Sequence, residues 1–246
     1  MLHLLKRHPI PIAAFFRRVL AITFAFPPEV LQPLVPQGLT LDTWRGFAFL
    51  AIALAQTEHL RPAFLPAFVG RSFFLSGYRI FTRLADAPSL RGLKILRSDT
   101  DRALMLCAGN LLTHYNYRLR HAALEEDGNK IRWRVETPRA EADLEVTAHV
   151  TDEPAHLPAD SPFATMADAR RFAGPLPYTF DHEQATGSII GILAERQHWT
   201  PQPVSVEIKQ ATFFEREPFC RVKPILANAF HVQNVPYRWQ RGRRLA

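Results

Sequence analysis

Five consecutive residues with hydrogen-bonding side chains, His114, Tyr115, Asn116, Tyr117 and Arg118, are the densest group in the sequence that could do chemistry. If this segment is extended, His114, Asn116 and Arg118 share one face and the two tyrosines share the other. The first set suits a carboxylate or carbonyl ligand, because arginine donates a planar fork of N–H groups and histidine can donate or accept a proton. We predict a ligand-binding site formed by these five residues. The alternative is that the tyrosines belong to the core and the other three residues to the surface.

Standard catalytic and cofactor-binding motifs do not occur in the sequence. It has no GxSxG nucleophile elbow, no HExxH zinc motif, no GxGxxG dinucleotide motif and no P-loop. Asp181, His182 and Glu183 are consecutive, and neighbouring residues on a strand point to opposite faces, so they would not converge on one ion. We therefore expect neither a metal ion nor a cofactor.

A Schiff-base mechanism needs a lysine whose amine is neutral near pH 7, through burial or a neighbouring cation. Lys94, in the apolar segment GLKIL, is the candidate. Its neighbours Leu93 and Ile95 would face opposite to it on a strand, so we expect Lys94 to face solvent. An inward orientation is the alternative.

The two cysteines, Cys107 and Cys220, are too few for a disulfide framework or a four-ligand zinc site. Cys107 directly follows three apolar residues, so we expect a buried, inert thiol. This cysteine usage, together with the lack of a secretory signal, favours a reducing, cytoplasmic setting. Arg17 and Arg18 precede the apolar run VLAITFAF, as in a twin-arginine export signal, but this short run ends at two prolines and fits a first strand better.

The formal net charge of +7 comes mostly from scattered arginines and favours small anionic ligands. We find no helix-turn-helix, zinc-finger or RNP motif, and so expect no specific nucleic-acid partner. No segment reaches the roughly 18 apolar residues that a membrane span requires, and we expect no membrane partner. The oligomeric state stays open, with a homo-oligomer among the alternatives.

The elements that would position the polar run are a strand and a helix. Leu93–Arg97 has the character of a strand, and Asp101–Leu112 has the apolar spacing of a short buried helix, which Asp99 or Asp101 would cap. Clear alternation of apolar and polar residues predicts antiparallel strands at Ile131–Glu136 and Leu144–Val150, with a hairpin turn at 125–129. Further strands are predicted at Val19–Phe26, Leu39–Trp44, Phe47–Ala55, Tyr78–Arg83, Pro203–Phe214 and Phe219–Phe230.

The remaining segments are predicted to be loops and short helices. Pro27–Pro36 is a short helix closed by prolines, 57–70 is an ordered loop over apolar surface, and Ala164–Phe172 is a helix after the connector Thr151–Pro162. We expect a loosely ordered lead-in at 1–14, a single domain at 15–241, and a basic tail at 242–246.

Several segments together resemble a known family. The run VLAITFAFPPEVLQPLVPQGLTLDTWRGFAFLAIALA, with SGYRIFTRL, RGLKILRSDTDRALMLCAGNLL and NAFHVQNVPYRW, is similar to the YqjF-like family of uncharacterised bacterial proteins, whose fold is akin to acetoacetate decarboxylase. The resemblance implies an α+β domain in which a curved, mostly antiparallel β-sheet or barrel surrounds an interior cavity, with a few peripheral helices.

The resemblance also indicates what is missing. In acetoacetate decarboxylase, a helix ending in Gly-Arg-Glu leads to a Pro-Lys-Lys stretch whose first lysine forms a Schiff base. Here the comparable segment reads GNLLTHYNYRL, with Leu111 at the position of the acid and Asn116, Tyr117 and Arg118 around the lysines. Because no lysine is present there, Schiff-base decarboxylation is not expected.

Three functions follow, in order of preference. The first is binding of a small organic acid or carbonyl compound in the cavity, between Arg118, His114 and Tyr117. The second is an enzyme, a lyase, isomerase or hydratase, in which His114 and Tyr117 act as acid–base groups. The third is an interaction protein that uses its basic surface, including the tail Arg238–Arg244.

Overall fold

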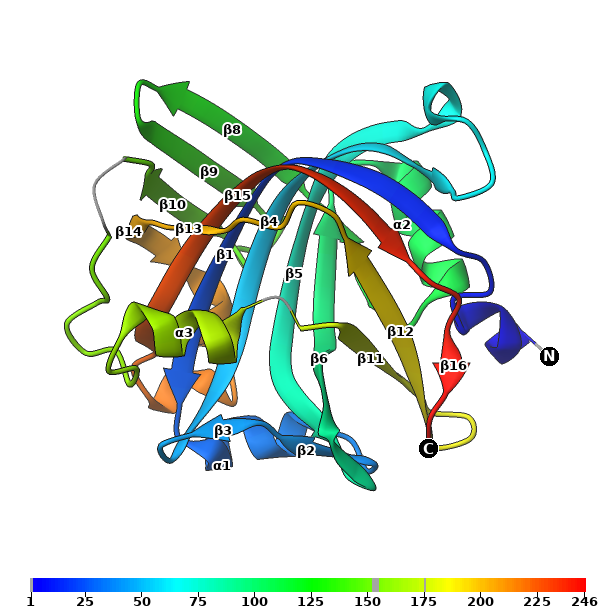
Figure 1. Ribbon diagram of the computed structural model, residues 1–246, viewed down its shortest axis with the longest axis horizontal. Coiled ribbons are helices and arrows are strands. Elements are labelled where there is room, and N and C mark those ends of the chain that lie inside the picture. Colours follow the sequence, from blue (N-terminus) through cyan, green and yellow to red (C-terminus); the bar gives the residue numbers. More distant parts are fainter. Residues whose placement is uncertain (1, 152–154, 175) are drawn as a thin grey trace.

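A long, curved sheet that nearly closes into a ring dominates the protein (Figure 1). The computed structural model describes residues 2–151, 155–174 and 176–246. The ring strands follow the spatial order β15, β1, β4, β5, β6, β11 and β12, and a short pairing of β12 with β15 joins the two ends. Their bounds are β1 (Ile12–Phe26), β4 (Phe47–Pro62), β5 (Arg71–Leu84), β6 (Ala87–Thr100), β11 (Tyr178–Glu183), β12 (Ser188–Arg196) and β15 (Ile225–Trp239).

Most neighbours in the ring are antiparallel, and β6 pairs in parallel with β11 and with β7 (Tyr117–Leu119). Four short strands extend the ring at its edges: β2 (Leu39–Leu41), β3 (Thr43–Trp44), β13 (Gln202–Pro203) and β16 (Arg243–Arg244). The expected fold, a curved and mostly antiparallel sheet with few helices, is confirmed.

A second sheet of four antiparallel strands packs against the outside of the ring. It consists of β8 (His121–Asp127), β9 (Lys130–Glu136), β10 (Leu144–His149) and β14 (Ser205–Ala211), in the order β14-β10-β9-β8. The inner residues of β9, Ile131, Trp133 and Val135, join the main core with Leu50 and Ile52 of β4. The apolar–polar alternation that predicted these strands therefore separates core from solvent.

Side-chain size alternates along the central strands. On β4, the large residues Leu50, Ile52 and Leu54 belong to the main core between the two sheets. The small residues Ala51, Ala53 and Ala55 face the other way and line a cavity. Because adjacent residues on a strand point to opposite faces, one apolar strand fills the core on its outer side and leaves space on its inner side.

Helices are few and lie around the sheets (Figure 1). In α3 (Met166–Ala173) the hydroxyl of Thr165 caps the helix by accepting from the Asp168 N–H, and Phe172 packs against Phe49 and Phe81. The other helical segments are α1 (Pro28–Leu31), α2 (Ala103–Leu112) and the 3₁₀ turns Leu2–Lys6, Gln32–Leu34, Ala67–Val69, Thr212–Glu215 and Phe219–Arg221. Within the described residues, no helix is both long and apolar enough to span a membrane.

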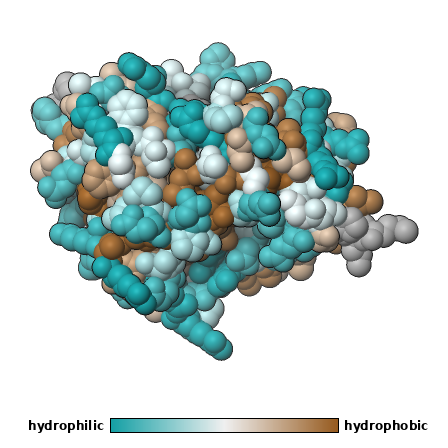
Figure 2. Space-filling model, turned by 90° about the horizontal axis from the view of Figure 1, so that it is seen from below, coloured by the Kyte–Doolittle hydropathy of each residue, from teal (hydrophilic) through white to brown (hydrophobic). Residues whose placement is uncertain are grey.

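The face shown in Figure 2 is mostly hydrophilic, with apolar areas between the polar side chains.

The described cysteines lie at the surface, since Cys107 and Cys220 are both exposed. The expectation that Cys107 is buried is wrong because α2 itself lies at the surface. Leu104 and Leu111 are exposed, and Gly109 is the one buried residue of that helix. The predicted cap by Asp99 or Asp101 is also wrong: Asp99 forms a buried ion pair with Arg97, and Asp101 accepts from the Phe74 N–H at 2.9 Å.

Other corrections concern the ends and one loop. The segment 57–70 does not fold over apolar surface: β4 continues to Pro62, and Phe64 and Phe68 are 73% and 84% exposed. The expected lead-in is held to the ring, because Arg7 pairs with the buried Glu183 at 2.6 Å and β1 already begins at Ile12. The last strand begins at Ile225 rather than Phe219, and Arg243–Arg244 form an edge strand on β12.

The core between the two sheets should depend on Trp133, which is 1% exposed. Truncation in Trp133→Ala leaves a cavity that cannot fully collapse, and we expect a loss of about 3–5 kcal/mol in the free energy of unfolding. Urea denaturation measures this loss. Lys130→Ala, on the exposed side of the same strand, should change the free energy by less than about 0.5 kcal/mol. Equal effects of the two substitutions would contradict this packing.

Candidate functional site

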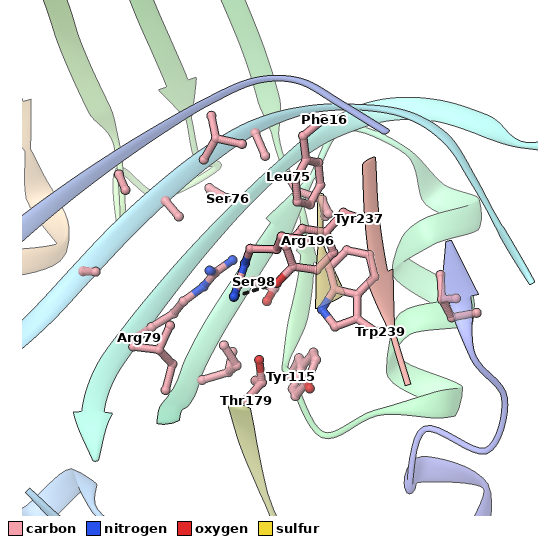
Figure 3. Close-up of a pocket in the computed structure, with 18 of the residues that line it drawn as sticks. Phe16, Leu75, Ser76, Arg79, Ser98, Tyr115, Thr179, Arg196, Tyr237 and Trp239 are labelled. Carbon is pink, nitrogen blue, oxygen red and sulfur yellow. Dashed lines mark hydrogen bonds between the residues drawn. The ribbon is translucent and has the colours of Figure 1, made fainter. Parts of the chain in front are cut away.

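The ring encloses a cavity of about 350 Å³ (Figure 3). Its wall is mostly apolar and comes from small residues of β1 and β4, from β5 and β6, and from larger side chains of β15. The larger apolar side chains of the wall include Phe16, Leu75, Ile95, Phe230, Val232 and Trp239. A concave, mostly apolar pocket of this size with a few polar groups is typical of small-molecule sites.

Arg79 projects from β5 into this cavity (Figure 3). Its Nε is buried and has no hydrogen-bond partner among the described residues, and no described carboxylate forms an ion pair with it. The preceding inward position is Gly77, where a Cβ would lie 2.8 Å from the Arg79 Nε. The glycine therefore leaves the space that the folded-back guanidinium occupies.

Arg196, the last residue of β12, brings a second guanidinium into the cavity. Its Nη2 donates to the Leu176 carbonyl at 2.7 Å and to the Tyr237 hydroxyl at 3.2 Å. The guanidinium carbon lies 5.4 Å from the ring centre of Trp199 and 5.1 Å from that of Tyr237. These contacts fix the guanidinium in place without neutralising it, since aromatic rings and neutral oxygens carry no net charge.

The two guanidiniums point towards one another, as Figure 3 shows. Burial lowers the pKa of Arg79, and the positive charge of Arg196 lowers it further, while Tyr237 raises it. Arginine nevertheless stays protonated in proteins, so the cavity holds two positive charges. A buried charge is costly unless it is paired, and the described residues supply no negative partner for Arg79. The cavity is therefore electrostatically suited to an anion.

Tyr115 and Tyr117 also line the cavity. Burial raises the pKa of Tyr115 well above its usual range and that of Tyr117 to about 12. Both hydroxyls consequently remain protonated at neutral pH and can act as hydrogen-bond donors. The Tyr115 hydroxyl is buried and has no hydrogen-bond partner among the described residues, so its donor is available to a ligand. Tyr117 packs onto α2 at Gly109, where a Cβ would lie 2.3 Å from the tyrosine ring.

The other three residues of the predicted site lie outside the cavity. The His114 N–H donates to the Asp181 carboxylate at 2.8 Å, and its Nδ1 lies 3.1 Å from the same oxygen. Asn116 adopts a positive φ of 53° at the turn into β7, and Arg118 pairs with Glu141 at 3.1 Å. The run thus divides between two faces, and the face that lines the cavity carries the tyrosines. Ligand binding by His114, Asn116 or Arg118 stays a prediction.

Lys94 lies on the outer face of β6, opposite Leu93 and Ile95, which line the cavity. Among the described residues that line the cavity there is no lysine.

The sequence analysis did not identify Arg79 and Arg196 as site residues. An arginine between Tyr78 and Ile80 in a strand buried on both faces was a usable signal for Arg79. The sequence around Arg196 gives no such signal, because this arginine lies at the end of its strand. The described residues also contain no group of three potential metal ligands.

Solved structures with the same architecture are known. An acetoacetate decarboxylase-like enzyme from Sphingomonas wittichii RW1 is 14% identical, with 98% of this chain and 94% of that chain covered and a TM-score of 0.66. The enduracididine biosynthesis enzyme MppR, complexed with pyruvate, is 11% identical over 97% and 91%, with a TM-score of 0.67. Acetoacetate decarboxylase from Legionella pneumophila is 12% identical over 97% and 88%, with a TM-score of 0.67.

These identities show a shared fold and no more. No curated protein sequence matches the chain. A family model does match: the DUF2071 family, described as an uncharacterized conserved protein, matches residues 14–236. That match agrees with the resemblance in the sequence to an uncharacterised family of acetoacetate decarboxylase-like fold, and the chain therefore belongs to the DUF2071 family.

Proposed function

We propose that the cavity binds a small organic acid, with its carboxylate between Arg79 and Arg196. The observation that carries the proposal is the Arg79 guanidinium, whose Nε is buried. It has no carboxylate partner among the described residues and faces a second guanidinium. A carboxylate accepts from guanidinium groups in short, charge-assisted hydrogen bonds. The expectation of an organic-acid ligand is kept, and its binding groups move from His114 and Arg118 to Arg79 and Arg196.

The cavity wall narrows the class of ligand further. Most of it is apolar, with Trp239 and Phe230 among the large side chains, so the ligand should carry an apolar body beyond its carboxylate. The free donor of Tyr115 would suit a carbonyl oxygen on the same ligand. One protein of this fold has been solved with pyruvate, which supports 2-oxo acids as the first compounds to test.

The proposal does not include a Schiff base. Lys94 lies on the outer face of β6, away from the cavity, and none of the described residues that line the cavity is a lysine. Acid–base catalysis by His114 and Tyr117 has less support than binding, because His114 is held by Asp181 outside the cavity. Burial also keeps Tyr117 protonated at neutral pH, so it would not serve as a base.

Binding should depend on both guanidiniums. Titration calorimetry with phenylpyruvate and with pyruvate should show tighter binding of phenylpyruvate, because its ring fills apolar space. In Arg79→Met we expect affinity to fall roughly 10- to 100-fold, since a hydrogen bond to a charged group contributes about 1.5–3 kcal/mol. Arg196→Met should have a similar effect.

Two controls accompany these titrations. The matched variant is Arg134→Met, which removes an exposed arginine of β9 and should leave affinity unchanged. The neutral analogue 2-phenylethanol, which lacks the carboxylate, should bind weakly to all variants. Failure of the unmodified protein to bind any organic acid, or full affinity in Arg79→Met, would rule the proposal out.

Without a ligand, Arg79 should destabilise the fold. A buried charge without a partner carries an uncompensated loss of hydration, so we expect Arg79→Met to raise the free energy of unfolding by about 1 kcal/mol or more. Arg97 is the matched control, because it is buried and paired with Asp99 at 2.8 Å. Arg97→Met should lower the free energy by about 3 kcal/mol. Urea denaturation measures both values, and a loss in Arg79→Met similar to that in Arg97→Met would identify Arg79 as a structural residue.

A further inference from the structure

A second hollow lies on the outer side of the ring, where β6 runs beside β11. It has a volume of about 580 Å³ and lies against the segment 33–36 and the turn between α2 and β7. Four of the described residues that line it are basic: Lys6, Lys94, His114 and His182. No lining residue is shared with the inner cavity except Thr113, so the two spaces are separate features of the fold.

Strand geometry brings the basic groups together. β6 and β11 are parallel with Lys94 beside Phe180, so His182, two residues further along β11, shares the outer face with Lys94. His114 comes from the turn after α2, and Lys6 from the 3₁₀ turn before β1. Four separate segments of the chain thus contribute one basic side chain each.

The positive charge of Lys94 has little compensation. Lys94 forms no ion pair or hydrogen bond with any described residue. The negative charge that acts on it is Asp181, whose carboxylate is already engaged by the backbone N–H groups of His114 at 2.8 Å and His182 at 2.9 Å. Burial lowers the pKa of Lys94, while Asp181 raises it. Burial also lowers the pKa of His182, and the Lys94 charge adds to that effect.

We propose that this outer hollow binds a phosphate group, with Lys94, His182, Lys6 and His114 as the basic groups around it. The two lysines carry two positive charges and Asp181 carries one negative charge, so the hollow keeps a net positive charge that favours an anion. A phosphate also presents several acceptor oxygens in different directions, which matches donors that arrive from four segments. Lysine, a point charge with three donors, is a common phosphate ligand.

The same chemistry fits free phosphate and the phosphoryl group of a small phosphomonoester. Titration calorimetry at low ionic strength and pH 7 should therefore use inorganic phosphate in one arm and glycerol 3-phosphate in the other. The compound that binds more tightly shows whether the site prefers free phosphate or a phosphomonoester. Acetate presents only two acceptor oxygens in one plane and cannot meet donors from four segments, so it should bind at least tenfold more weakly than either. Binding of the phosphate compounds should also weaken as sodium chloride is added, because salt screens exposed charges.

Lys94→Gln removes the charge and keeps a similar length, and we expect it to weaken phosphate binding at least tenfold. Lys6→Gln, on a separate segment, provides the same test with a smaller expected loss of severalfold if Lys94→Gln does not fold. The matched control is Lys130→Gln, an exposed lysine of β9, which should bind phosphate like the unmodified protein.

The outcomes are decisive in both directions. Phosphate affinity that Lys94→Gln reduces and Lys130→Gln leaves unchanged supports the site. No binding of either phosphate compound at millimolar concentration, or equal affinity in Lys94→Gln and the unmodified protein, would overturn it. Arg79→Met should retain phosphate binding, so this test is independent of the proposal for the inner cavity.

Discussion

Alternation of side-chain size along β1 and β4 is the constraint on which the rest of the structure depends. Leu20 and Leu50 face outward and join the core between the two sheets, while Ala21 and Ala51 face inward. Protein interiors are normally filled at crystal-like density, so a space of about 350 Å³ persists only where the inward residues are too short to close it. The outer core supplies the stability that the hollow interior lacks.

That interior holds charges which a filled core would exclude. Arg79 has a buried Nε and no negative partner among the described residues, whereas the buried Arg97 is matched by Asp99 at 2.8 Å. The contrast within one protein separates two uses of a buried arginine. An arginine that is paired with a carboxylate contributes to the fold. An unpaired arginine keeps an uncompensated desolvation cost, which a bound anion can offset. Destabilised groups of this kind are characteristic of binding sites.

The same strands serve two spaces because their side chains alternate between faces. On β11, Thr179 lines the inner cavity and His182 lines the outer hollow. Asp181 lies between these two residues along β11, and its carboxylate accepts hydrogen bonds from the backbone N–H groups of His114 and His182. This buried carboxylate therefore anchors the turn after α2 to the ring. It holds in place the segment that gives Tyr115 to one side of the wall and His114 to the other.

The sequence by itself determined many of the strands, the hairpin turn and the division of residues 114–118 between two faces, because a period of two is a local property of the backbone. It did not predict β11 or β12. Motifs in the sequence also determined the family. Only the tertiary structure decided which face meets the cavity, because that depends on strands far apart in the chain. Arg79 and Arg196 face one another only because β5 and β12 belong to the same ring. The apolar helix α2 is exposed, and its sequence could not predict this, because a local pattern does not indicate which other segments pack against a helix.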